Sequence, residues 1–291
     1  MSDLAPAVDD MRRQAFNVLT FVAVMTANGL AGAGAISGES IGVIANRYRS
    51  YFLPADYVFA IWSLIYLMLL VFIVYQALPG NRARPVLRRV GWWWSVNGVL
   101  NIAWVTTFSF GLFGLSLIIM LGLLGTLIGI HVRVGLDEHL TWSERVSVSY
   151  PFGLYLSWIC IAVIANTFQF VTYMEWSWLG IHRPVWSAIM AVVATAVSIV
   201  VVWKRGLWIF PLVVAWALAG IAVRFGDIPV IARTGWAMVA LALVTVPVAL
   251  RFRWVRRASS VAMAIILISG ATSGATAQSA VLRGPVVDNA G

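Results

Sequence analysis

The chain has 291 residues, of which 61% are hydrophobic and 11% are charged. Its mean hydropathy is +0.90, and its apolar content exceeds the ~45–50% of an ordinary soluble domain, which excludes a water-soluble globular protein. The formal net charge of +9 does not indicate nucleic-acid binding, because the arginines stand in short segments between apolar runs, where they set membrane orientation. The single cysteine, Cys160, excludes a disulfide framework and a cysteine-based zinc site.

Residues 1–15 are predicted to form a cytoplasmic segment with no cleaved signal peptide, because no small-residue cleavage site follows a short apolar core. Eight charge-free apolar runs follow. Each is close to the ~20 residues of a transmembrane helix, and about twice the length of a barrel strand, so helices are favoured over strands. The runs lie at about residues 16–36, 57–78, 92–111, 113–132, 148–171, 185–203, 207–223 and 234–250.

Two connections between these runs have distinctive features. The connection 37–56, which contains Gly38, Gly42 and Pro54, is the only long external one in the first half and is predicted to cover a cavity mouth. The third and fourth runs nearly touch around Gly111 and Gly114, which predicts a tight helical hairpin.

We assign no binding or catalytic role to the acidic cytoplasmic connection or to the carboxyl-terminal residues 258–291. One cytoplasmic connection gathers acidic and histidine side chains, which we interpret as a solvated loop and not as a metal site. Residues 258–291 are predicted to form a loosely ordered tail, with a ninth span over 258–280 as the alternative, because their apolar core at 261–268 is too short to cross unaided. The acidic and histidine residues are His131, Asp137, Glu138, His139 and Glu144.

Lysine and arginine are distributed unevenly between the two sides of the membrane. With the amino terminus inside, 15 of the 20 fall in cytoplasmic connections, and the alternation holds through every connection. We therefore expect a multi-pass protein of a bacterial inner membrane with a cytoplasmic amino terminus. The five external arginines are Arg47, Arg49, Arg183, Arg224 and Arg233.

The cores of the eight runs contain no Asp, Glu, Lys, Arg or His, and such side chains usually mark proton relays and ion pathways in membranes. The sequence also lacks a phosphate-binding glycine loop, a paired-histidine zinc helix and a nucleophile elbow. The protein is therefore not expected to be an enzyme, and no cofactor is expected to be required.

Three stripes of aromatic, amide and small side chains follow helical spacing in the second, third and fifth runs. Each stripe should face away from lipid, because an unpaired amide is costly in hydrocarbon. Two interpretations remain open: hydrogen bonding between packed helices, or the lining of a pocket for a flat apolar ligand. The stripes are Trp62 and Tyr66; Asn97, Asn101 and Trp104; and Trp158, Ala162 and Asn166.

Three segments of the chain carry recognisable signatures: Pro54, Tyr57, Val58, Phe59, Trp62, Leu64 and Tyr66; Asn101, Trp104, Phe108, Phe110 and Gly111; and Leu154, Tyr155, Leu156, Trp158, Ala162 and Asn166. Over about residues 16–171 they resemble, in the same order, signatures of the translocator protein, or tryptophan-rich sensory protein (TspO/MBR), family. The resemblance implies a five-helix bundle that binds porphyrins or sterol-like molecules in a pocket under the first connection. The pocket residues that it implies are Trp62, Asn101, Trp104, Trp158, Ala162 and Asn166, together with Tyr66.

The chain is therefore predicted to be an all-α integral membrane protein, with a TspO-like five-helix bundle at 16–171, a three-helix extension at 172–257 and the tail at 258–291. Its expected function is the binding, sensing or transport of a flat apolar ligand such as a porphyrin, as a membrane receptor. The alternatives are a carrier for a small neutral solute and a structural membrane subunit. Its expected partners are the lipid bilayer and a small apolar ligand, with homodimer formation left open and nucleic acid excluded.

Overall fold

The computed structural model describes residues 4–135, 140–176, 178–248 and 250–251. Within these ranges the chain forms helices and their connections, with no strand. The described residues up to Val246 form one compact unit. The predicted tail at 258–291 and its alternative ninth span lie outside the described residues, as do Asp137, Glu138 and His139.

Each of the eight predicted spans coincides with a helix. Among the described helices, six are long and apolar enough to cross a membrane, whereas α5 and α10, with 17 and 16 residues, are shorter. The protein is thus an all-α, multi-pass membrane protein. The helices are α1 (Leu4–Gly32), α3 (Ile61–Ala77), α5 (Trp93–Ser109), α6 (Phe113–Val134), α8 (Tyr150–Tyr173), α9 (Arg183–Arg205), α10 (Ile209–Arg224) and a further helix at Pro229–Val248.

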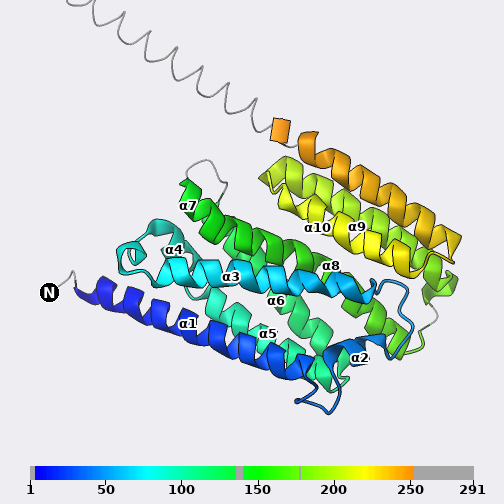
Figure 1. Cartoon of the computed structure of the whole chain (residues 1–291), viewed down its shortest axis with the longest axis horizontal. Helices are drawn as coiled ribbons and strands as arrows, with labels where there is room; N and C mark the ends of the chain where they lie inside the picture. Colours follow the sequence, from blue (N-terminus) through cyan, green and yellow to red (C-terminus); the bar gives the residue numbers. More distant parts are fainter. Residues whose placement is uncertain (1–3, 136–139, 177, 249, 252–291) are drawn as a thin grey trace, which may run out of the picture. The chain divides into compact units, whose positions relative to one another are not determined.

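Short helices lie in the connections. The segment between α1 and α3 contains α2 (Ile41–Asn46), whose first turn is capped by the Ser40 hydroxyl accepting from the Val43 amide, and the 3-10 helix η1 (Asp56–Ala60). Helix α4 (Pro85–Val90) follows α3, and α7 (Trp142–Glu144) precedes α8. Figure 1 shows α4 near the end of the molecule where α1 begins, and α2 at the opposite end.

The tight hairpin between the third and fourth spans is confirmed. Helix α5 ends at Ser109 and α6 begins at Phe113, and Gly111 between them has a φ of 73°, a left-handed conformation that favours glycine. Close packing continues along the pair, because a Cβ on Gly129 would meet the ring of Trp93 at 3.0 Å.

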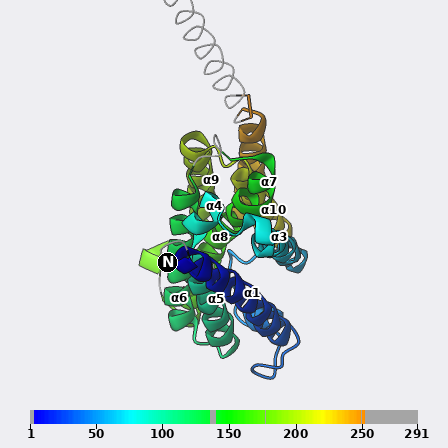
Figure 2. The ribbon, with the colours of Figure 1, turned by 90° about the vertical axis from the view of Figure 1, so that its left-hand side faces the viewer.

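The contacts between helices arrange the spans around α8, which is the most deeply buried of the six long spans. Helix α5 packs on α1 and α6, α6 packs on α8, and α3 packs on both α1 and α8. Helix α10 packs on α8 and on α9. In both views α9 and α10 lie on the side of α8 away from α1 and α5 (Figures 1 and 2).

Candidate functional site

Aromatic side chains from three spans meet where α3, α5 and α8 approach one another. The Trp62 ring stacks on Tyr66 and on Trp104, with ring centroids 5.5 and 6.1 Å apart and planes within 25° of parallel. Trp62 also contacts Tyr155 and Trp158 edge-on, at 5.9 and 6.1 Å. We call the set the aromatic cluster; it consists of Phe59, Trp62, Tyr66, Trp104, Tyr155 and Trp158.

The helical spacing of these residues explains why they meet. Trp62 and Tyr66 are four residues apart on α3, and Tyr155 and Trp158 are three apart on α8, so each pair lies on one face of its helix. Trp104, Tyr155 and Trp158 are buried, whereas Trp62 and Tyr66 are partly exposed. Phe59, the sixth member, is also partly exposed, and the rings contact one another directly.

An amide from α5 links two further helices beside the cluster. The Asn101 side chain accepts a hydrogen bond from Asn28 of α1 at 2.7 Å and donates one to the Tyr155 hydroxyl of α8 at 2.9 Å. Asn101 and Tyr155 are buried, and buried polar groups are stable only when paired. This chain of hydrogen bonds therefore joins α1, α5 and α8.

A second amide holds one of the clustered indoles. The Trp104 indole donates to the Asn166 side-chain oxygen at 3.2 Å, and Asn166 also lies 3.3 Å from the Ser116 hydroxyl of α6. These contacts form a network across α5, α6 and α8. The orientation of the Trp104 ring is thereby fixed by a hydrogen bond as well as by stacking.

The Trp158 indole nitrogen is buried and has no hydrogen-bond partner in the structure. The side chain is only 3% exposed. An unpaired N–H in an apolar interior costs free energy of about 1–3 kcal/mol. This donor is therefore available to an acceptor that the protein itself does not supply.

Two predicted site residues are placed differently from the rest. Asn97 donates to the Thr126 hydroxyl at 2.7 Å and to the Leu123 carbonyl, both on α6, so its amide ties α5 to α6 and does not contact the cluster. Ala162 is partly buried on α8 and packs against the core.

Several residues that contact the predicted set were not among the predicted site residues, and three of them lie at the aromatic cluster or beside it. Tyr155 and Phe59 contribute rings, and Asn28 contributes the amide from α1. Tyr155 precedes Trp158 by three residues, and that spacing is the signal that would have placed it on the same face. Asn28 has no aromatic residue three or four positions away on α1, so no comparable signal marks it.

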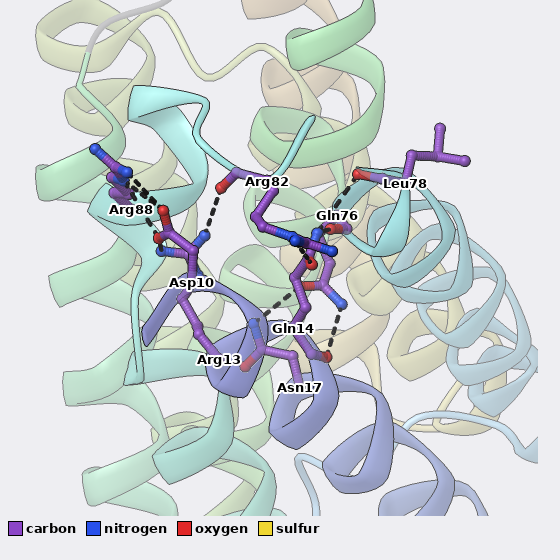
Figure 3. A network of polar contacts seen from close by, with 8 residues as sticks. All are labelled: Asp10, Arg13, Gln14, Asn17, Gln76, Leu78, Arg82 and Arg88. Carbon is purple, nitrogen blue, oxygen red and sulfur yellow. Dashed lines mark hydrogen bonds and ion pairs between the residues drawn. The ribbon is translucent and has the colours of Figure 1, made fainter. Parts of the chain in front are cut away.

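A second polar network lies near the amino-terminal end of α1 (Figure 3). The buried Asp10 carboxylate accepts hydrogen bonds from Arg13 at 2.6 Å and from Arg88 of α4 at 3.0 Å. These contacts with Asp10 raise the pKa of the Arg88 guanidinium above its usual value. Arg13 also donates to the Arg82 carbonyl at 2.9 Å.

Amides continue this network toward the membrane interior. Gln14 accepts from Arg82 at 3.0 Å and donates to the Gln76 carbonyl, and the Gln76 side chain returns a hydrogen bond to the Gln14 carbonyl at 3.2 Å. Asn17 donates to the Gln76 side chain at 3.3 Å. Because these groups satisfy one another, the network fastens α1 to α3 and α4 and leaves no buried donor or acceptor of these residues for a ligand.

A surface depression and the described acidic and histidine side chains have no part in the aromatic cluster. A surface depression of about 400 Å³ is lined by Tyr51, Trp176 and residues 180–184, none of them a predicted site residue. Among the described residues no group of three or more His, Cys, Asp or Glu side chains comes together to hold a metal. Glu144 instead caps the turn that begins at Thr141 and pairs with Arg84 at 3.4 Å.

The fold and the aromatic cluster define a multi-pass, all-helical membrane protein whose interior rings come from three different spans. The sequence model of the family described as TSPO-like protein matches residues 14–250. Because the match covers most of the chain, the protein belongs to the TSPO-like family, and the match extends beyond the predicted range of 16–171 to include the last three helices. No curated protein and no solved structure matches the chain. Membership identifies it in general terms as a membrane ligand-binding or sensory protein, in a family of mostly non-enzymatic binding and transport proteins.

Proposed function

We propose that the protein binds a flat, largely apolar ligand, such as a porphyrin or a related tetrapyrrole, at the aromatic cluster. The observation that carries this proposal is the stacking of the Trp62 ring on both Tyr66 and Trp104, which shows that this interior already accommodates flat rings in near-parallel contact. Stacked rings and a few convergent polar groups are the usual lining of a pocket for such a ligand.

The partly exposed members of the cluster provide the route of entry in this proposal. When Trp62 turns away from Trp104, a flat ligand takes its place and makes the same face-to-face contact. The unpaired indole N–H of Trp158 then donates to a polar group of the ligand, such as a carboxylate or carbonyl. Asn101 and Asn166 hold Tyr155 and Trp104 in place through their hydrogen bonds.

Titration of the purified protein in nanodiscs with protoporphyrin IX, followed by the absorption of the porphyrin, tests the proposal. We expect Trp104→Ala to weaken binding at least about tenfold, because it removes the ring on which the ligand stacks, a contact worth ~1–3 kcal/mol. Trp158→Ala should weaken binding by a similar factor, because it removes the N–H donor to the ligand. Trp203→Ala is the matched control, because this tryptophan is 68% exposed on α9 and lies outside the aromatic cluster. Equal affinity in the wild type and in both cluster variants would show that the ligand binds elsewhere.

A further inference from the structure

Helix α10 is hydrogen-bonded to the backbone of the connection that leads into α3. The Gly220 carbonyl accepts from the Ala55 amide at 3.2 Å, the Trp216 indole donates to the Val58 carbonyl at 3.0 Å, and the Arg224 guanidinium donates to the Pro54 carbonyl at 3.2 Å. Trp216, Gly220 and Arg224 are spaced four residues apart, so they lie on one face of α10. This face is directed at residues 54–58.

Polar side chains extend the attachment to the rest of the connection. Arg224 donates to the Asn46 side-chain oxygen at 2.5 Å and lies 3.5 Å from the Asp56 carboxylate, to which Asn46 also donates at 3.2 Å. On α9, the buried Ser187 hydroxyl donates to the Tyr51 carbonyl at 2.7 Å. The connection is thus held at residues 46, 51, 54, 55, 56 and 58.

Gly220 allows this close approach. A Cβ at this position would lie 2.1 Å from a methyl group of Val58 and 3.3 Å from Pro54. Val58 is fully buried, and its β-branched side chain has little rotamer freedom. Any side chain at position 220 would therefore push η1 away from α10.

The attached segment leads directly to the aromatic cluster. Val58 is followed by Phe59, whose ring contacts Trp158 at 6.2 Å, and η1 continues without a break into α3, where Trp62 is the second residue. Trp216 also contacts the Tyr57 ring edge-on at 5.5 Å. A displacement of η1 from α10 therefore moves Phe59 and Trp62 relative to Trp158 and Trp104.

We propose that Trp216, Gly220 and Arg224 of α10 are positioning residues, and that together they clamp the connection 46–58 and so set the rate at which a ligand reaches the aromatic cluster. The clamp itself stands on the contacts above. Its effect on ligand entry rests on the proposed function, because it assumes that the cluster is the binding site. On this proposal, α10 controls access to the aromatic cluster although it contributes no ring to the cluster.

Amide hydrogen exchange of the full chain in nanodiscs, without ligand, tests the clamp. We expect peptides covering residues 46–60 to exchange at least about tenfold faster in Trp216→Phe, Arg224→Gln and Gly220→Ala, because local opening of a segment is what exchange reports. Trp216→Phe retains an aromatic ring and removes the donor, so it remains informative if Gly220→Ala does not fold. The matched controls are Arg233→Gln, at an exposed arginine of the next helix, and Gly125→Ala, at a glycine of α6 with open space around it.

Peptides from α5 and α6 provide the internal reference for these variants. Faster exchange confined to residues 46–60 supports the clamp. Unchanged exchange there in all three variants overturns it, and so does an equal acceleration in α5 and α6, which would show a general loss of the fold.

The association rate of protoporphyrin IX, measured by stopped flow with the same variants, tests the effect on entry. We expect the rate to rise at least about threefold in Trp216→Phe and Arg224→Gln, as for other loops that limit access to a site. Faster exchange with an unchanged association rate overturns the role of the clamp in entry. If the wild type and every variant fail to bind protoporphyrin IX, the proposed function fails, while the exchange measurement still decides whether the clamp exists.

Discussion

At the scale of single residues, the two buried indoles of the aromatic cluster differ in one respect. Trp104 donates to Asn166, whereas the nitrogen of Trp158 has no partner. Both rings are buried and both contact Trp62. The hydrogen bond at Trp104 contributes to stability, while the unpaired donor at Trp158 reduces it.

Phenylalanine substitutions separate these two effects. We expect Trp104→Phe to lower the free energy of unfolding by at least about 1 kcal/mol more than Trp158→Phe, since only the first substitution removes a hydrogen bond, and the second removes an unpaired donor. Equilibrium unfolding of the ligand-free protein in mixed detergent micelles measures both values. Equal losses, or a larger loss for Trp158→Phe, would mean that a water molecule or lipid group already satisfies the Trp158 nitrogen.

The sequence could predict the aromatic members of the site better than its amides. Periodicity places Trp62, Trp104 and Trp158 on interior faces, and the structure brings their rings together. Asn97 shares the stripe of Asn101 but bonds to α6, because a helix in the middle of a bundle has neighbours on more than one side. Which neighbour receives an amide depends on packing between helices, and spacing within one helix does not determine it.

At the scale of elements, the apolar runs predict where the spans lie, but they do not predict the residues at which the helices begin and end. Helix α1 begins at Leu4, ahead of the apolar run that starts at about residue 16, and its Asp10 carboxylate pairs with Arg13 one helical turn further on and with Arg88 of α4. Charged residues that would otherwise mark a loop are therefore accommodated within the helix. The small helix α2 was not predicted, since a single turn capped by Ser40 leaves little periodicity to detect.

Alanine substitutions at two glycines, Gly111 in the turn between α5 and α6 and Gly125 within α6, should change the free energy of unfolding in opposite directions. Gly111 has a φ of 73°, and a Cβ added there would meet no atom within 4 Å, so Gly111→Ala is opposed by backbone strain alone. We expect it to lower the free energy of unfolding by about 1–2 kcal/mol. Gly125→Ala, inside α6 and also with open space, should leave it unchanged or raise it by up to about 1 kcal/mol.

Unfolding of both glycine variants in mixed micelles gives the comparison directly. A loss at Gly125→Ala as large as that at Gly111→Ala would point to lost helix packing and not to the turn. No loss at Gly111→Ala would show that the turn rearranges at little cost.

At the scale of the whole molecule, the number of crossings depends on the shortest helices. Helix α10 has 16 residues, which corresponds to about 24 Å at the rise of an α-helix, less than the ~30 Å hydrocarbon core. Its neighbours favour a crossing, since it packs along α8 and α9, two of the long apolar helices. The crossing also agrees with the alternation of lysine and arginine expected from the sequence, which assigns Lys204 and Arg205 to the cytoplasmic side and Arg224 and Arg233 to the external side.

Labelling of single cysteines from either side of the membrane determines both the crossing of α10 and the orientation of the chain. In a Cys160→Ser background, Arg205→Cys and Asp227→Cys place exposed thiols before and after α10. We expect a membrane-impermeant maleimide to label position 205 only in inside-out vesicles and position 227 only in right-side-out vesicles, because the side richer in lysine and arginine faces the cytoplasm. Labelling of both from one side would mean that α10 does not cross, and the reverse pattern would place the amino terminus outside.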